Sequence, residues 1–597
     1  MLQTADDSRQ TAIEPASQPL TAAARLTHLY CAIMRSRHIT PTLRAGLLLV
    51  AVSCVARAES PPRVFDLSLL VASDRPCTWP QGWPVFQLHH HRTIGPLSPY
   101  HVDTLLIDPN TGTQMDVPPH SIPPPDSELP NAGPAGLLYT ERIPSWQFCG
   151  EACVIDCRDL LDAAENGTSP LITKAHVHSW EAEHRPLRQG DVALFFSGYS
   201  DRYYRPLPEG RRFLAEPLEG TAPAWPDPDP DCMEYLASRG VMTVGTDSPS
   251  IGPIPDLAEP THVAGLRYGM IFTEGATGLG QLPSSGAFYC MLGPKHQQAA
   301  GSEVRALAIA EGPLAARLIE SARRRRVVDL SVPLAESLPV TWPGSGVGNS
   351  RQPYYTVRFG HRATVGVPFQ THLLDSHAGT HLVPPAYALP AKTDKPPQYS
   401  PEVIRWRDEY EARFGPLGTT DRTVDQVPIG QTCGPARVVD VRHRIGSTSS
   451  SDWPASPPIT ADDLRKAEKA HGRFADGDIV ILQTGWSDQY LKPLPDGAAC
   501  MDDPLNGRSE GWPALTPEAV RFLAECGVRC VCTDAPTVGG VDPQQALMTY
   551  WALGAADMVA VEFLTNIDRI EPNAFFIFAA IKIRGAHGAP GRAIVLH

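Results

Sequence analysis

A long internal duplication limits the folds open to this chain more than any other feature. Val64-Phe-Asp-Leu-Ser68 returns 263 residues later as Val327-Val-Asp-Leu-Ser331. Gly190-Asp-Val-Ala-Leu-Phe-Phe-Ser-Gly-Tyr-Ser-Asp201 returns as Gly477-Asp-Ile-Val-Ile-Leu-Gln-Thr-Gly-Trp-Ser-Asp488. A repeat of this length is a domain and not a solenoid unit. We therefore predict two tandem domains, which span 64–309 and 327–597 and are joined by a linker helix at 310–326.

Each unit alternates short apolar segments with helical ones. Val192–Ser197 and Ile479–Thr484 are continuous apolar runs between Gly-Asp and Gly, which is typical of buried strands. A helix that begins at a Thr N-cap, Thr173 or Thr460, precedes each run. The pattern predicts an α/β fold with the functional site near the carboxyl ends of the strands.

The N-terminal region has the features of an export signal. A basic segment, Met34–Arg44, is followed by the apolar run Ala45–Val55 and by Ala56-Arg-Ala58. This order predicts a secretory signal peptide at 34–58 and a periplasmic or secreted protein, with 1–33 as an extension from a start assigned too far upstream. The apolar run is too short for a membrane span. A lipoprotein or a loose N-terminal helix are the alternatives.

Charge and motifs narrow the class of partner. The formal net charge of −14 excludes a broad phosphate-binding surface, so no nucleic-acid partner is expected. It does not exclude a small acidic substrate, because a bound metal can invert the local field. The chain has no phosphate loop and no dinucleotide-binding fingerprint. A small-molecule substrate is therefore expected.

Two equivalent segments carry the candidate chemistry. The first is Asn110-Thr-Gly-Thr-Gln-Met-Asp-Val-Pro-Pro-His120, and 267 residues later the second is His377-Ala-Gly-Thr-His-Leu-Val-Pro-Pro-Ala-Tyr387. In an extended segment, His377 and His381 lie on one side, so both imidazoles can approach one ion. Further along, His262 and Glu274 are twelve residues apart, as are Tyr550 and Glu562. A second pair of ligand types can complete a metal site.

These segments resemble the H-x-G-T-H-x-D-x-P-x-H signature of the cyclase family, which includes bacterial kynurenine formamidases and isatin hydrolase. The resemblance extends over nearly all of both units. It implies compact α/β domains of the swivelling type, dimeric association and a divalent cofactor, Zn or Mn. It also implies that the two upstream His, the Asp, and the downstream His and Glu bind the metal, and that the last His transfers protons.

Each unit keeps a different part of this signature. The metal ligands implied for the first unit are Asn110, Gln114, Asp116, His262 and Glu274, and the implied catalytic residue is His120. Those implied for the second unit are His377, His381 and Glu562. Asn110 and Gln114 replace the two upstream His, whereas Val383, Tyr387 and Tyr550 replace the Asp and the two other His.

The two sets predict different chemistry. The carboxylate-rich first set suits manganese or another hard divalent ion, and His120 beside a metal-bound water makes a hydrolytic pair. The His₂Glu second set suits zinc, but Tyr387, with a pKa near 10, is a poor base at neutral pH. The sequence is compatible with three alternatives: the first unit is active, the second unit is active, or neither is.

Several other side chains could have either a functional or a purely structural role. The resemblance suggests that Trp79, Trp342 and Tyr387 contact substrate, although a Trp in the core or at an interface fits equally well. His89-His90-His91 would point to alternate faces of a strand, so a structural or surface role is favoured over metal binding. Eleven of the thirteen cysteines follow the signal sequence, and this odd number leaves at least one thiol unpaired within the chain.

The sequence therefore predicts a metal-dependent hydrolase of an amide, formamide or lactam C–N bond in a small carbonyl compound, similar to an arylformamidase. A secreted pseudoenzyme or binding protein with decayed metal sites is one alternative, and a metal-dependent cyclase or lyase is another. A duplicated interface predicts an internal pseudo-dimer, and a homo-oligomer is compatible with it.

Overall fold

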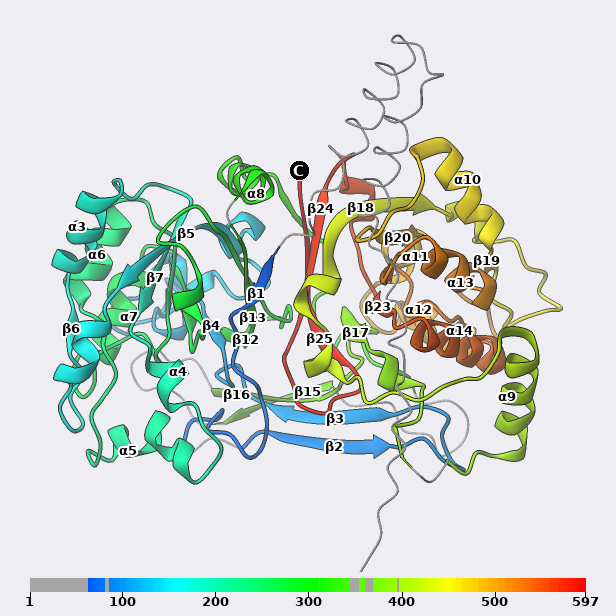
Figure 1. Cartoon of the computed structure of the whole chain (residues 1–597), viewed down its shortest axis with the longest axis horizontal. Helices are drawn as coiled ribbons and strands as arrows, with labels where there is room; N and C mark the ends of the chain where they lie inside the picture. The colour runs from blue at the N-terminus through cyan, green and yellow to red at the C-terminus, as the bar shows by residue number, and fades with distance from the viewer. Residues whose placement is uncertain (1–62, 81–84, 311, 344–353, 360–368, 394–396) are drawn as a thin grey trace, which may run out of the picture. The chain divides into compact units, whose positions relative to one another are not determined.

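The computed structural model describes residues 63–597 except 81–84, 311, 344–353, 360–368 and 394–396 (Figure 1). The expected signal peptide at 34–58 and the extension at 1–33 lie outside the described residues. Within the described residues, no helix is long and apolar enough to cross a membrane.

The first tandem segment is built on a nine-stranded sheet. Its order is β1 (Val64–Asp66), β13 (Arg305–Ile309), β11 (Phe288–Leu292), β5 (Cys149–Asp156), β7 (Asp191–Phe196), β9 (Thr243–Thr246), β10 (Ile271–Glu274), β4 (Gln114–Asp116) and β12 (Gly301–Glu303). The four central strands β5, β7, β9 and β10 are parallel, and the flanking strands are antiparallel. Minor elements are β6 (Leu171–Ile172), β8 (Asp227–Pro228), α4 (Tyr199–Tyr203) and α5 (Ala215–Leu218).

Helices cover both faces of this sheet because its strands are apolar on both sides. Alternate residues of β5 face different cores: Cys153 and Ile155 pack with α3 (Lys174–Glu183), α6 (Pro230–Ser238) and α7 (Ala258–Leu266). Ala152 and Val154 pack on the side of α8 (Pro313–Arg323). This two-residue period is the one expected of a strand buried on both faces.

The second tandem segment repeats the plan with eight strands. Their order is β14 (Val327–Asp329), β25 (Ala589–Leu596), β17 (His381–Val383), β23 (Val559–Glu562), β22 (Cys530–Thr533), β20 (Ile479–Gln483), β18 (Cys433–Asp440) and β24 (Phe575–Ala580), and β24 also pairs with β25. Its other elements are α9 (Pro401–Phe414), α10 (Ala461–His471), α11 (Trp486–Tyr490), α12 (Ala498–Leu505), α13 (Pro517–Glu525), α14 (Pro543–Ala555), β19 (Pro458–Ile459) and β21 (Ala514–Leu515). Thr173 and Thr460 cap α3 and α10, as predicted. The predicted class, two tandem mixed α/β domains, is confirmed.

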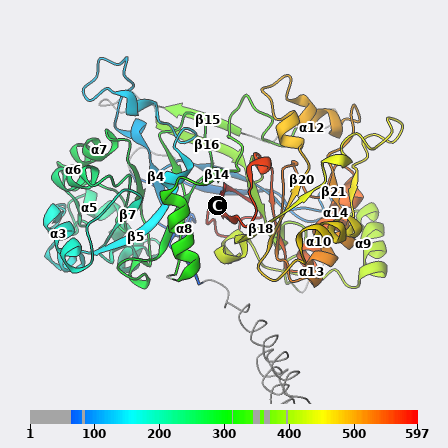
Figure 2. The ribbon, with the colours of Figure 1, turned by 90° about the horizontal axis from the view of Figure 1, so that it is seen from above.

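A four-stranded sheet takes two strands from each tandem segment. Its order is β15 (Tyr354–Phe359), β16 (Phe369–Asp375), β3 (Val102–Ile107) and β2 (Gln87–Arg92). β16 and β3 are antiparallel, and Leu373 lies opposite Leu106. Figure 1 shows β2 and β3 running beneath the ribbons of the second segment, and Figure 2 shows β15 and β16 along the opposite side from α8.

Partly buried ion pairs also join the tandem segments. Lys295 Nζ lies 3.0 Å from Asp329, and Lys582 Nζ lies 3.0 Å from Asp66. Each lysine therefore reaches the aspartate of the other segment. The eleven cysteines within the described residues are free thiols, and ten of them are buried.

Candidate functional site

The Gly-Thr step of each motif has a structural role. Gly112 and Gly379 adopt φ values of +69° and +58°, in the left-handed region that favours glycine. The Thr113 hydroxyl donates to the Gly275 carbonyl at 2.7 Å, and Thr380 donates to Phe563 at 2.7 Å. These bonds hold β4 against β10 and β17 against β23, where the chemistry-bearing residues lie.

Strand register then places equivalent residues opposite each other. Gln114 faces Glu274 across β4 and β10, and His381 faces Glu562 across β17 and β23. The Gln114 amide donates to Glu274 Oε2 at 2.5 Å. The replacement of an upstream His by Gln114 thus keeps a polar contact to the same carboxylate.

The first motif brings two carboxylates and two imidazoles together. His262, on α7, places Nε2 3.4 Å from Asp116 Oδ2 and 3.4 Å from Glu274 Oε1. His120 ends the 3₁₀ helix Pro118–His120, and its Nδ1 lies 3.2 Å from Asp116 Oδ1. Asp116, His262 and Glu274 are buried, whereas the His120 side chain is 17% exposed.

The charges of this cluster suit a divalent ion. Burial opposes protonation of His262, but the two carboxylates outweigh it and raise the pKa of His262 to about 10. Two carboxylates on either side of one imidazole therefore favour positive charge at this point. Potential ligand atoms of Asp116, His120 and His262 all lie within 4.8 Å of one another. Carboxylate and imidazole donors so arranged fit zinc or manganese.

Asn110 lies in the turn before β4. Its backbone N–H donates to Asp108 Oδ1 at 2.8 Å, and the residue is buried. Burial is the main cause that raises the pKa of Asp108 to about 7, and the charge of Glu303 adds to this rise. The hydrogen bonds from Asn110 and Thr111 act in the opposite direction. The proposed ligand role of Asn110 stays a prediction.

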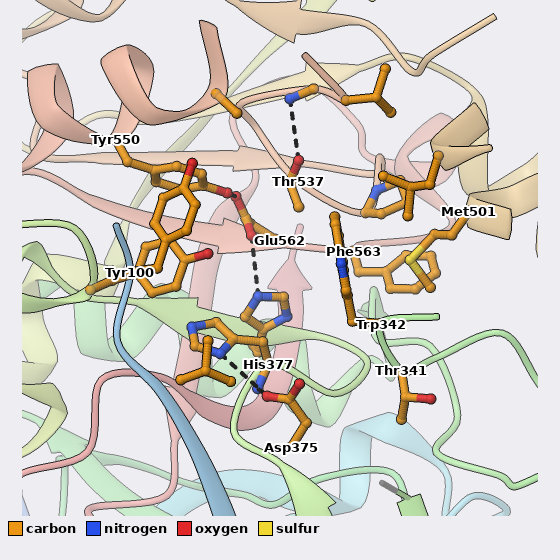
Figure 3. A pocket seen from close by; sticks show the side chains of 18 of the residues that line it. Tyr100, Thr341, Trp342, Asp375, His377, Met501, Thr537, Tyr550, Glu562 and Phe563 are labelled. Carbon is orange, nitrogen blue, oxygen red and sulfur yellow. Dashed lines mark hydrogen bonds and ion pairs between the residues drawn. The ribbon is translucent and has the colours of Figure 1, made fainter. Parts of the chain in front are cut away.

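The second motif forms a different network (Figure 3). His381 Nε2 lies 3.1 Å from Glu562 Oε2. The other oxygen, Oε1, accepts hydrogen bonds from the Tyr550 hydroxyl at 2.6 Å and from the Val538 N–H at 2.8 Å. A phenol thus occupies the position of the downstream imidazole, and it satisfies the carboxylate without an ion.

His377 is not drawn into this network. Its Nδ1 lies 3.0 Å from the Ser376 hydroxyl and 3.4 Å from Asp375 Oδ1. Within the described residues, His377, His381 and Glu562 are not among the groups of three or more His, Cys, Asp or Glu whose ligand atoms lie within 4.8 Å. His381 and Glu562 therefore form a pair, with His377 apart from it, and the proposed ligand role of this His₂Glu set stays a prediction.

A cavity of about 250 Å³ opens beside this pair. Trp342 and Tyr387, predicted to contact substrate, both line it, whereas Trp79 packs against the hydrophobic core. Arg92 and Tyr100, from the first tandem segment, also line the cavity. The sequence does not predict these two residues at the site, because no local pattern shows that β2, β3 and the segment between them reach the second motif.

Three phenols form one wall of the cavity. Tyr100 stacks on Tyr387 with ring centroids 4.8 Å apart, and Tyr387 meets Tyr550 edge-on at 4.9 Å. Burial raises the pKa of all three tyrosines well above its ordinary value, so they remain neutral hydrogen-bonding groups. This cavity can recognise a small aromatic compound, and the residue at the proton-transfer position of the motif, Tyr387, is a neutral phenol instead of an imidazole.

Comparisons with known proteins agree with this architecture. Residues 65–253 and 328–539, more than half of the chain, match the model of the family described as "Putative cyclase". The chain therefore belongs to the cyclase family, and it carries the family domain twice.

Curated relatives match less than half of this chain. An isatin hydrolase from Roseibium aggregatum is 25% identical over 232 residues, 38% of this chain and 73% of the relative. A kynurenine formamidase from Paracidovorax citrulli is 27% identical over 248 residues, 42% of this chain and 97% of the relative. The solved isatin hydrolase A from Labrenzia aggregata is 22% identical, with a TM-score of 0.35, and the match covers 44% of this chain and 99% of the solved one.

Proposed function

We propose that the first domain is a metal-dependent hydrolase that cleaves an amide, formamide or lactam C–N bond in a small carbonyl compound. The observation that carries this proposal is the convergence of Asp116, His120, His262 and Glu274 at hydrogen-bonding distances. The names of the relatives, isatin hydrolase and kynurenine formamidase, support the same bond class. A metal-dependent cyclase or lyase reaction is the alternative that the same residues allow.

The residues of this cluster have separable roles. Asp116, His262 and Glu274 would hold the ion, with Gln114 beside Glu274. Bound zinc or manganese supplies Lewis acidity and lowers the pKa of water. His120 is the partly exposed imidazole, so it can take a proton from the attacking water and return it to the leaving nitrogen. Asp116, 3.2 Å away, orients that imidazole.

The test is a substrate panel of formanilides, lactams and isatin with three variants. Asp116→Ala removes an anionic ligand, so bound metal and turnover should fall together. His120→Ala should keep metal and lower turnover by roughly 10² to 10⁴, the usual contribution of a general acid–base group. His381→Ala, in the second domain, should leave turnover nearly intact. Loss of activity in His381→Ala but not in His120→Ala would place catalysis in the second domain.

The second domain supports a binding function. Its cavity has an aromatic wall and a Glu562 already satisfied by Tyr550, so we infer metal-independent binding of a small aromatic compound there. Trp342 lines the cavity and serves as a fluorescence probe. Compounds of the substrate panel should quench its emission in the chelator-treated protein. Equal quenching in Trp342→Phe would contradict binding at this cavity.

The tandem domains are proposed to form an internal pseudo-dimer. Leu106 and Leu373, which face each other across β3 and β16, are 267 residues apart, the same offset as Asn110 and His377. Equivalent residues that face each other mark a pseudo-two-fold axis, and the reciprocal lysine–aspartate pairs described above have the same symmetry. The domain limits 64–309 and 327–597, with a linker at 310–326, belong to this proposal.

Export is also proposed, on the basis of the sequence at 34–58 alone. N-terminal sequencing of the protein from its native host should begin at Glu59. A mature chain that retains residues 1–33 would contradict it.

A further inference from the structure

A second cluster of metal-ligating side chains lies outside both motifs. The buried carboxylate of Asp103, on β3, accepts a hydrogen bond from His90 on β2, with Nδ1 and Oδ1 2.7 Å apart. The Nδ1 of His587, in the segment before β25, lies 3.2 Å from both oxygens of the same carboxylate. One carboxylate and two imidazoles, from both tandem segments, therefore meet at one point.

The surroundings of this cluster are organised around it. The backbone N–H of His587 donates to Asp103 Oδ2 at 2.6 Å, which holds the carboxylate in place. His101 stacks on the His587 ring at 4.0 Å, and its own Nδ1 is buried without a hydrogen-bond partner. The His90 side chain is 48% exposed, so one side of the cluster is open to solvent.

The duplicated fold does not require these residues. β2 and β15 are equivalent with the 267-residue offset, and that offset relates His90 to Val357 and Asp103 to Gln370. A second offset applies near the end of each segment. Arg305 pairs with Asp66, and Arg592, which is 287 residues further along, pairs with the equivalent Asp329.

That second offset relates His587 to Ala300. The equivalent end of the four-stranded sheet therefore has a valine, an amide and an alanine in these positions. Among the described residues, His90, Asp103 and His587 are therefore not repeated at the equivalent positions, so the duplicated fold can be built without them.

We propose that His90, Asp103 and His587 bind a transition-metal ion of the zinc class. Two imidazoles and one carboxylate are a common zinc ligand set that leaves a position for solvent. Tetrahedral zinc with bonds of about 2.0–2.1 Å holds its ligand atoms about 3.3 Å apart. The observed separations of 2.7 and 3.2 Å are close to that spacing, and potential ligand atoms of all three residues lie within 4.8 Å of one another.

An ion at this point would link the two tandem segments beside the second-domain cavity. Arg92, two residues from His90 on β2, lines that cavity, as does Tyr100, next to His101. His587 precedes Gly588, whose position lies directly against the His377 ring. Metal binding is therefore expected to stabilise both the pairing of the segments and the shape of the cavity wall.

The experiment measures zinc binding in the full chain after removal of metal with a chelator. All variants carry Asp116→Ala, which disables the first-domain centre, so the result does not depend on the proposed function. In this background we compare His90→Ala and Asp103→Asn with His89→Ala. His89 is a matched control because it lies on the same strand and pairs with Gln87 instead.

The expected result is that His90→Ala binds one zinc fewer per chain, or binds it at least about 10-fold more weakly, since even an outer-shell partner contributes that much. Zinc should raise the Tm of His89→Ala more than that of His90→Ala. The exposed His90 variant keeps the test decisive if Asp103→Asn does not fold. Equal zinc binding in His89→Ala and His90→Ala, whether unchanged or reduced in both, would overturn the proposal.

Discussion

Asp329 offers a sharp test of how the tandem segments are joined. It is partly buried at the end of β14, where Arg592 Nη2 lies 2.7 Å and Lys295 Nζ 3.0 Å from its carboxylate. Burial opposes ionisation, but these two cations outweigh it and lower the pKa of Asp329 to about 2. The perturbation is Asp329→Asn, which keeps the size of the side chain and removes its charge.

The magnitude follows from linkage between protonation and folding. A fall of the carboxyl pKa from 3.8 to about 2 corresponds to about 2 kcal/mol of stability, at about 1.4 kcal/mol per unit. This contribution is present above the unfolded-state pKa of 3.8 and is lost as the pH falls through about 2. At neutral pH the variant should lose about 3 kcal/mol or more, because Arg592 stays buried without its anionic partner.

The assay is urea unfolding of the wild-type and variant chains between pH 7 and about pH 2. Their difference in unfolding free energy should shrink by about 2 kcal/mol as the pH falls. Asp74→Asn is the control, because Asp74 pairs with Arg584 at the surface and should change stability by less than about 1 kcal/mol. A difference for Asp329→Asn that does not vary with pH, or that matches the control, would show that the charge of Asp329 does not stabilise the folded chain.

Two further predictions concern the second motif. Gly379→Ala should destabilise the chain by about 2–4 kcal/mol in urea unfolding, because its Cβ would lie 2.6 Å from a core leucine; Gly477→Ala, at φ +82° with open space, should lose only about 1–2 kcal/mol. A similar loss in both would show that packing at Gly379 is unimportant. The double variant Tyr550→His, Val383→Asp should restore an imidazole and a carboxylate beside Glu562 and gain one divalent ion per chain in metal analysis. An unchanged metal content would show that these two replacements alone do not convert the second motif into a metal centre.

Much of the fold and part of the site could be predicted from the sequence alone. The duplication, the strands around 192–197 and 479–484 and the N-caps at Thr173 and Thr460 appear in the structure where the sequence places them. These features depend on apolar periodicity and on side chains that bond to their own backbone, so neighbouring residues determine them. The equivalence of Gln114 and His381 follows in the same way from a constant offset.

The contacts of each set of residues depend on the tertiary structure. Tyr550 is a single replacement in the sequence, but in the structure its hydroxyl donates to Glu562, while His377 lies beside Ser376 and Asp375. Tyr100 reaches the second-domain cavity from the first segment.

The cluster of His90, Asp103 and His587 depends on the tertiary structure even more than the second-domain cavity does. The alternation of strand faces favours a structural or surface role for His89–His91. The structure places one member, His90, against Asp103 together with His587, which is 497 residues away from His90. Such contacts depend on the register of strands brought together by packing of the whole core, and no local pattern in the chain encodes that register.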